Sequence, residues 1–211
     1  MRRVVVLALL ALALPIAASA GTIDITNQFG SISISALTGI TSTQSHLEMF
    51  DGITPSVPTH SLGFVNFTTG ALTSGSIFAG GTFAGGAASS FDVLGVGAWA
   101  KTWTGCSSCK NPISLFVGSF VGSVDWTLTG VNKQSRYYQL TGDIAGWLYG
   151  DHWVTGMTTQ NFFTTGPQLN QGIGHISVGR SELTVPEPGT LGLLGTGLVG
   201  IAGLFRRKLI R

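Results

Sequence analysis

The sequence predicts an all-β fold, an antiparallel β-sandwich of jelly-roll type, followed by one C-terminal transmembrane helix. Three observations lead to this prediction. Apolar and polar residues alternate with a period of two along much of the chain, glycine-rich turn signals separate many short segments, and residues 189–205 carry no charge. Such alternation, rich in β-branched and aromatic residues, is typical of antiparallel strands with one buried face.

Residues 1–20 have the features of a secretory signal peptide. Two arginines precede an apolar run over residues 4–16, and small residues close the segment. The run is shorter than the ~20 residues of a membrane-spanning helix, and this order of residue types is typical of a cleaved export signal. We therefore expect signal peptidase to remove the segment; an uncleaved anchor is the alternative. The predicted cleavage site is formed by Ala18, Ala20 and Gly21.

Residues 21–184 form the predicted extracytoplasmic β-domain. Ile32 and Ile34 alternate with serines, and Trp126 shares its face with Val124 and Leu128. No segment before the tail shows a helical period. Ten short strands favour a sandwich, and a flat β-solenoid is the alternative, although no fixed repeat supports it. The predicted strands cover residues 22–26, 31–36, 61–67, 76–83, 91–96, 113–121, 124–129, 136–149, 152–165 and 175–185.

The predicted tail, residues 185–211, has three parts: a Pro-Glu-Pro tripeptide, the uncharged segment 189–205 and a basic end over 206–211. As a helix the uncharged segment would rise about 25 Å, slightly less than a ~30 Å hydrocarbon core. Basic residues after it predict a cytoplasmic C-terminus, and hence a membrane-anchored precursor that faces the periplasm. The tripeptide is Pro186, Glu187 and Pro188, and the basic flank is Arg206, Arg207, Lys208 and Arg211.

This order of a Pro-Glu-Pro motif, a short glycine-rich apolar segment and a terminal arginine cluster resembles the PEP-CTERM sorting domain. The resemblance implies processing by an exosortase, a membrane-embedded cysteine protease or transpeptidase, in a Gram-negative bacterium that makes exopolysaccharide. Similar tails are also labelled as the C-terminal domain of ice-binding proteins. An anchor that no enzyme processes is the alternative. Residues 61–165 in turn resemble uncharacterised exported β-domains, through the patterns at 67–70, 125–130 and 140–142.

The charge of the exported segment argues against a nucleic-acid partner. The whole chain has a formal net charge of +2, but six of its basic residues lie in the two terminal signals. Without them, five Lys and Arg stand against nine Asp and Glu, and no basic cluster is left. Nucleic-acid binding requires such a cluster.

Cys106 and Cys109 form the one C-x-x-C pattern of the chain. In an exported protein we expect them to form a short disulfide. A thioredoxin-like role would require the first cysteine at a helix N-terminus. A zinc site would require further ligands, for which the candidates are His46, His60, His152 and His175.

Few residues suggest catalysis. Asp151 and His152 could belong to a hydrolytic triad, but the chain lacks a G-x-S-x-G elbow. The pattern G-x-G-x-x-G at 195–200 has no strand before it, so it does not indicate a dinucleotide site. We therefore predict no catalytic residue, no cofactor and no metal, with a secreted hydrolase as an alternative.

Aromatic residues suggest two further readings. Exposed rings stack on sugar faces, whereas buried rings fill a core. A threonine-rich strand at 154–159 could present hydroxyl groups to ice, although it lacks a regular ladder. The sequence thus predicts a non-catalytic surface or extracellular-matrix protein, with an exopolysaccharide-binding module as the alternative. The six aromatic candidates for sugar contact are Trp99, Trp103, Trp126, Trp147, Tyr149 and Trp153.

Overall fold

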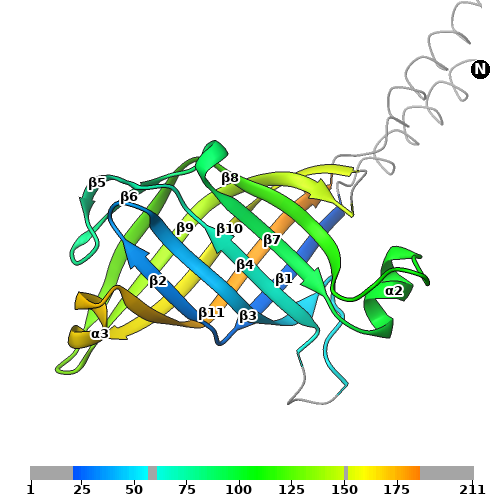
Figure 1. Ribbon diagram of the computed structural model, residues 1–211, viewed down its shortest axis with the longest axis horizontal. Helices are drawn as coiled ribbons and strands as arrows, with labels where there is room; N and C mark the ends of the chain where they lie inside the picture. The colour runs from blue at the N-terminus through cyan, green and yellow to red at the C-terminus, as the bar shows by residue number, and fades with distance from the viewer. Residues whose placement is uncertain (1–20, 57–60, 150–151, 186–211) are drawn as a thin grey trace, which may run out of the picture. The chain divides into compact units, whose positions relative to one another are not determined.

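A computed structural model describes residues 21–56, 61–149 and 152–185, which form mostly antiparallel strands with three short helices (Figure 1). Residues 22–184 make one compact unit. The strands are β1 (Gly21–Gln28), β2 (Ser31–Ser35), β3 (Gly39–Phe50), β4 (Gly63–Thr68), β5 (Leu72–Ser76), β6 (Gly80–Ala84), β7 (Ser90–Gly95), β8 (Ile113–Val131), β9 (Ser135–Leu148), β10 (His152–Thr165) and β11 (Ile173–Val185). The helices are η2 (Gly86–Ala88), α2 (Ala98–Thr104) and α3 (Gly166–Asn170).

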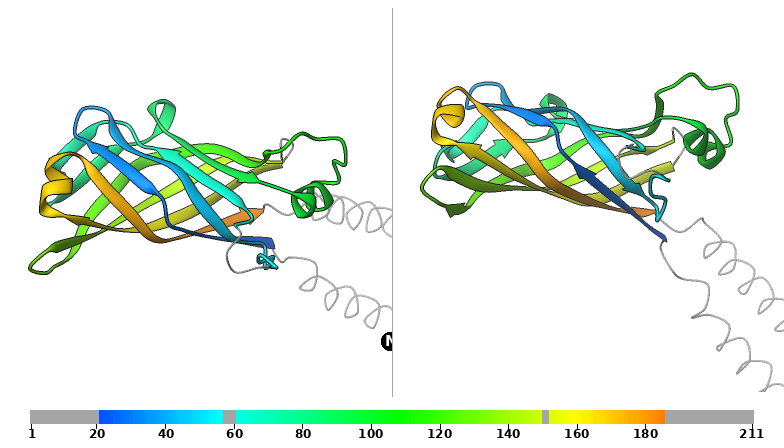
Figure 2. Two further views of the ribbon diagram at one scale, coloured as in Figure 1. Left: turned by 60° about the horizontal axis from the view of Figure 1, so that its bottom comes forward. Right: turned by 90° about the horizontal axis from the view of Figure 1, so that it is seen from below.

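Eight strands form a closed barrel in the order β8-β7-β4-β3-β1-β11-β10-β9, and pairing between β8 and β9 closes the ring. The two closing strands pair from Phe116 opposite Leu148 to Val131 opposite Arg136. Strand β2 joins β11 to β3, and the β5–β6 hairpin continues the sheet along the second half of β8. Figures 1 and 2 show the strands inclined to the long axis of the barrel.

The all-β prediction is confirmed, but the predicted jelly-roll sandwich is wrong. Alternation of inward and outward residues is the same in a sandwich and in a barrel, because both bury one face of each strand. The difference lies in strand pairing, which alternation does not report. Here the 19 residues of β8 pair with β7, β6 and β9, and this long strand allows one sheet to close on itself.

The predicted transmembrane helix is not supported. No helix within residues 21–56, 61–149 or 152–185 is long and apolar enough to cross a lipid bilayer. The segment 189–205 to which the prediction refers lies outside these residues, as do the signal peptide and the Pro-Glu-Pro tripeptide.

Several local predictions also need correction. Strand β3 was not predicted, the hairpin of β5 and β6 was predicted as one strand over 76–83, and β8 was predicted as two. The helices α2 and α3 were not predicted either. The reason at β3 is visible in its burial: Ser42 and Ser45 face inward, and Gln44 between them has a φ of 59° and interrupts the alternation. Polar residues on the buried face hide a strand from any hydrophobic pattern.

Part of the barrel interior is filled by a cluster of aromatic rings, which we call the aromatic cluster. Phe91 on β7 contacts Phe67, Phe116 and Phe120, with ring centroids 5.9–6.2 Å apart. The series continues through Phe162 to Trp126 and Tyr138, whose rings stack at 4.5 Å. All seven rings are almost fully buried. Aromatic packing of this kind contributes beyond the area it buries.

Glycines on the inner face make room for these rings. A Cβ atom at Gly142 would lie 2.8 Å from the ring of Phe120, and one at Gly118 would lie 2.6 Å from the ring of Phe116. Both distances are too short for a side chain. The glycines of β8 and β9 therefore allow large rings to fill the barrel from neighbouring strands.

Another part of the interior holds a hydrogen-bonded polar network, on strands that also bury aliphatic side chains such as Ile25 and Leu183. Asn27 on β1 and Gln160 on β10 exchange two amide hydrogen bonds, of 3.0 and 3.2 Å. Asn27 also donates to Ser45 at 2.7 Å, and Gln160 donates to Thr158 at 2.9 Å. Ser181 on β11 donates to Thr158 at 2.8 Å. Burial without a partner is costly for polar groups, so these mutual bonds are what makes the arrangement stable.

Candidate ligand-binding surface

The structure divides the six aromatic candidates into three groups. Trp126 is 1% exposed and donates from its indole nitrogen to the carbonyl of Ile77, so it belongs to the core. Trp99 and Trp103, on α2, pack against the buried ring of Phe50 at 6.0 and 4.9 Å. These three side chains support the barrel and the helix beside it.

Trp147 and Trp153 are exposed on the outer face of the barrel, at 48% and 49%. They are direct cross-strand neighbours on β9 and β10, and their rings meet edge to face at 5.3 Å. Val117 on β8 lies opposite Trp147 on the other side and is also half exposed. Three adjacent strands thus present one apolar row to solvent.

A hollow of about 390 Å³ opens beside this row; we call it the loop hollow. One side is the outer face of β8 and β9, and the other is the loop that follows α2 and carries the disulfide. Tyr149 lies at the end of β9, where its backbone has a φ of 47° and its amide donates to the carbonyl of Leu115. The hollow is lined by Cys109, Lys110, Pro112, Ile113, Ser114, Val117, Trp147 and Tyr149.

A second hollow, of about 530 Å³, lies farther along the same outer face. Its floor contains Ala145, whose small side chain leaves space between larger neighbours such as Met157. Asp143 and Glu182 give it acidic walls. The remaining lining residues are Val121, Ile144, Thr155, Gly156 and Thr184.

Cys106 and Cys109 form a disulfide in the structure, with Cα atoms 5.5 Å apart. The pair follows the C-terminus of α2, whose C-cap residue Gly105 has a φ of 68°. A redox-active cysteine gains its low thiol pKa from a helix N-terminus, and this geometry places the cysteines at the opposite helix end. The arrangement therefore favours a structural disulfide that closes a turn.

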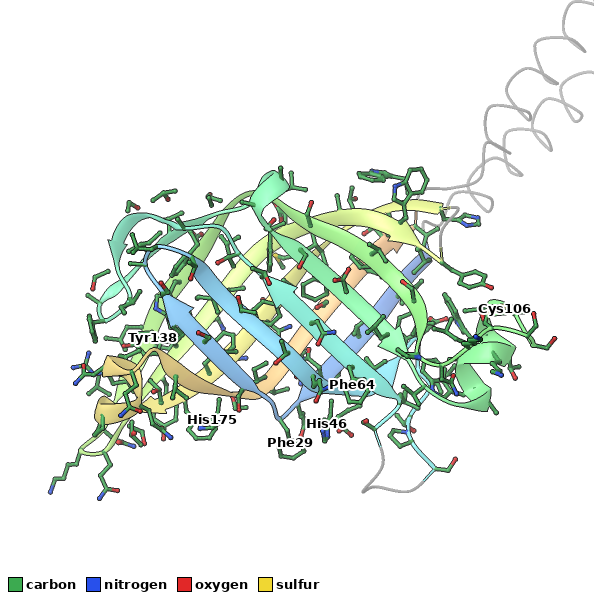
Figure 3. The ribbon with its side chains drawn as sticks, in the orientation of Figure 1. Phe29, His46, Phe64, Cys106, Tyr138 and His175 are labelled. Atoms are coloured by element: carbon green, nitrogen blue, oxygen red, sulfur yellow. A yellow bond between two sulfur atoms is a disulfide. The ribbon has the colours of Figure 1, made fainter. Side chains whose placement is uncertain are left out.

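The histidine candidates are not brought together within the described residues. The ring of His46 lies between those of Phe29 and Phe64, at 6.1 and 6.3 Å, as Figure 3 shows on the outer face. His175 lies near α3, against Phe163 and Gln168. Within residues 21–56, 61–149 and 152–185, no three His, Cys, Asp or Glu side chains are grouped to hold a metal ion.

The candidates for a hydrolytic triad, a zinc ligand and an ice-binding strand do not form a site in the described residues. Asp151 and His60 lie outside the described residues, and His152 begins β10. In the threonine-rich strand, Thr158 is buried, so hydroxyl groups do not form a continuous outward ladder.

Asp92 on β7 has a perturbed carboxyl group. Its strand neighbour on one side is Val117, at the edge of the exposed apolar row. Burial raises the pKa of Asp92 above the ordinary value of 3.8, because the charged form loses hydration. The carboxyl group is not part of the loop-hollow lining.

Sequence reasoning missed Lys110, Pro112 and Val117. Nothing in the local pattern around Lys110 distinguishes it from a solvated surface lysine, since its role depends on the fold that brings the loop to β9. The outward position of Trp147, by contrast, can be predicted from the sequence. Leu140, Ile144 and Leu148 occupy even-numbered positions of β9 and face inward, so the odd-numbered Trp147 faces outward.

Comparison with known families identifies one part of the chain. Residues 184–208 match the family described as the PEP-CTERM protein-sorting motif. No curated protein and no solved structure matches the chain. The tail is thus an exosortase sorting signal, and it directs the protein to the cell surface or the extracellular space. The similarity of residues 61–165 to exported β-domains stays a prediction.

Proposed function

We propose that this chain is a non-catalytic surface or extracellular-matrix protein. In this proposal signal peptidase removes residues 1–20, the precursor faces the periplasm, and an exosortase then processes the chain near Pro186-Glu187-Pro188. The sorting motif at 184–208 is the observation that carries the proposal. The packed aromatic and polar interior also supports it, because the described side chains fill the space in which many barrels bind a small ligand.

The test is the intact mass of protein recovered from cells with and without an active exosortase. We expect loss of both terminal signals in the first strain and retention of the C-terminal signal in the second. Glu187→Gln should reduce processing, whereas the matched change Glu182→Gln, on the exposed face of β11, should not. Recovery of the chain with both ends intact from exosortase-positive cells would contradict the proposal.

A second candidate function is exopolysaccharide binding by the same barrel. The exposed Trp147–Trp153 pair favours it, because two large rings are held in solvent beside a hollow. Tryptophan faces bind the apolar faces of sugar rings, and exposing them without a partner has no advantage for stability. Concave sites with aromatic walls are the usual form of small-ligand sites.

This function can be tested with exopolysaccharide extracted from the cells that make the protein. Full-length protein in non-ionic detergent should be retarded in native gels that contain the polysaccharide. The double variant Trp147→Ala/Trp153→Ala should migrate as it does without polysaccharide. Tyr137→Ala removes an exposed ring from the same face of β9, ten residues away, and should keep the retardation. Equal migration of the parent and the double variant would rule out this tryptophan pair.

A further inference from the structure

The loop hollow contains one charged side chain, Lys110, among apolar and aromatic neighbours. Residues 98–112, which include α2 and the disulfide loop, contain two lysines and no acidic residue. The exported segment as a whole has more acidic than basic residues. The disulfide loop therefore reverses the sign of the charge locally, at the edge of the exposed aromatic row.

The two lysines differ in their contacts. Lys101 donates to the carbonyl of Ser107 at 3.4 Å, which ties it to the loop. The ammonium group of Lys110 has no ion-pair or hydrogen-bond partner among the described residues, and its side chain is exposed. Because the disulfide constrains the loop next to Cys109, the start of this side chain is held at the rim of the hollow.

The opposite wall provides a flat apolar surface. Trp147 on β9 and Tyr149 just after it line the hollow, and the edge-to-face contact with Trp153 limits the rotation of the Trp147 ring. A ligand that uses both walls combines a flat apolar face with a negative charge at its edge. A sugar ring with a carboxylate has both features, whereas a neutral sugar would contact the aromatic wall alone and leave the exposed ammonium group to water.

From this geometry we propose that the loop hollow binds an acidic sugar residue of a polysaccharide, with the ring on Trp147 and the carboxylate at Lys110. This inference rests on the proposed polysaccharide binding and specifies its ligand class. Charge complementarity decides between ligands, because the aromatic wall alone would accept neutral sugars as well.

The experiment compares polysaccharides that differ in charge alone. The probes are polygalacturonate and alginate, each paired with its esterified, uncharged form, in native gels with full-length protein. We expect about two- to fivefold tighter binding to the acidic forms at low salt, the range of one exposed ion pair, and a loss of that preference at high salt as the charges are screened.

Variants locate the effect. Lys110→Gln should weaken binding to the acidic forms about two- to fivefold, the range of one exposed ion pair, and should leave the esterified forms unaffected. Lys133→Gln, an equal charge change on the hairpin after β8, should alter neither. Trp147→Ala should weaken binding to all forms by roughly tenfold. Unchanged thermal unfolding midpoints would show that each variant is folded.

The outcomes separate this inference from the proposed polysaccharide binding. Equal binding of acidic and esterified forms overturns the acidic-sugar inference and keeps polysaccharide binding. A Lys133→Gln effect as large as that of Lys110→Gln also overturns the inference, since a general field would then explain the preference. Absence of binding to every polysaccharide overturns both.

Discussion

The aromatic cluster and the polar network of the barrel interior reach the same degree of burial by different chemistry. Around Phe91 the space is filled by rings that contact one another without hydrogen bonds. Around Asn27 and Gln160 it is filled by amides and hydroxyl groups that satisfy one another. Ring packing tolerates small shifts at modest cost, whereas a hydrogen-bonded network loses a whole interaction when one member is changed. The aromatic cluster and the polar network should therefore respond differently to substitution.

The largest effect is expected in the aromatic cluster. Phe91→Ala removes a ring that contacts three others, so the variant loses buried apolar area and leaves a cavity. We expect a loss of about 3–5 kcal/mol in the free energy of unfolding, measured by denaturant titration. Phe163→Ala, at a ring that is partly exposed on β10, is the control and should cost much less. A similar loss at both positions would show that the rings do not form the core described above.

A substitution at Gly179 tests how tightly the polar network is packed. A Cβ atom there would collide with Oε1 of Gln160 and Oδ1 of Asn27. Gly179→Ala should therefore displace the amide pair and lower the free energy of unfolding by about 2 kcal/mol, as overpacking does. Gly130→Ala adds the same methyl group where the nearest atom is 3.6 Å away, and should be almost neutral in thermal unfolding.

The amide pair itself allows a double-mutant cycle. Asn27→Leu alone leaves the amide of Gln160 without its buried partner and should cost about 1–3 kcal/mol. Adding Gln160→Met removes the second amide, so the combined variant should be more stable than the sum of the single losses predicts. Strict additivity of the three unfolding free energies would mean that the two side chains do not interact.

Ser42, the cross-strand neighbour of Phe67, gives the opposite case. Its hydroxyl oxygen is buried and has no hydrogen-bond partner among the described residues. Ser42→Ala should therefore leave stability unchanged or raise it by up to about 1 kcal/mol, since an unsatisfied group is removed. Ser45→Ala, which breaks bonds to Asn27 and to the carbonyl of Phe29, is the matched control and should be destabilising.

The smallest effect is the pH dependence of stability that Asp92 causes, next to Phe91 on β7. Because burial raises the pKa of this carboxyl group above 3.8, the folded state binds its proton more tightly than the unfolded state. Its contribution to stability is present at lower pH and is lost as the pH rises through the raised pKa. Asp92→Asn should thus gain stability relative to the parent between pH 3 and pH 7 in urea titrations. A constant difference between the two proteins over this range would contradict the expected shift.

The sequence predicted the strands whose inward residues are apolar and whose outward residues are polar. It failed where inward residues are polar. Trp126 and Val124 share an inward face, as their alternation indicates. At β3, inward serines and the positive φ of Gln44 removed the signal. Closure of the sheet depends on which strands pair, and the alternation within one strand does not predict its pairing partner.

The candidate site divides in the same way. The outward position of Trp147 can be derived from the period of β9, because its neighbours alternate cleanly. The contribution of Lys110 cannot, because the loop that holds it meets β9 through tertiary structure alone. Aromatic surface is therefore predictable from a strand pattern, while the charged group that completes a binding site depends on folding.

Closure of the barrel also affects how copies of this protein can stand next to one another. Among the described strands, β5 alone has a single strand neighbour, and it has five residues and an irregular register. Open sheet edges are the places where separate molecules join backbone to backbone into aggregates. With its edges joined into a ring, the protein can be displayed at high density on a surface and still remain a set of separate molecules.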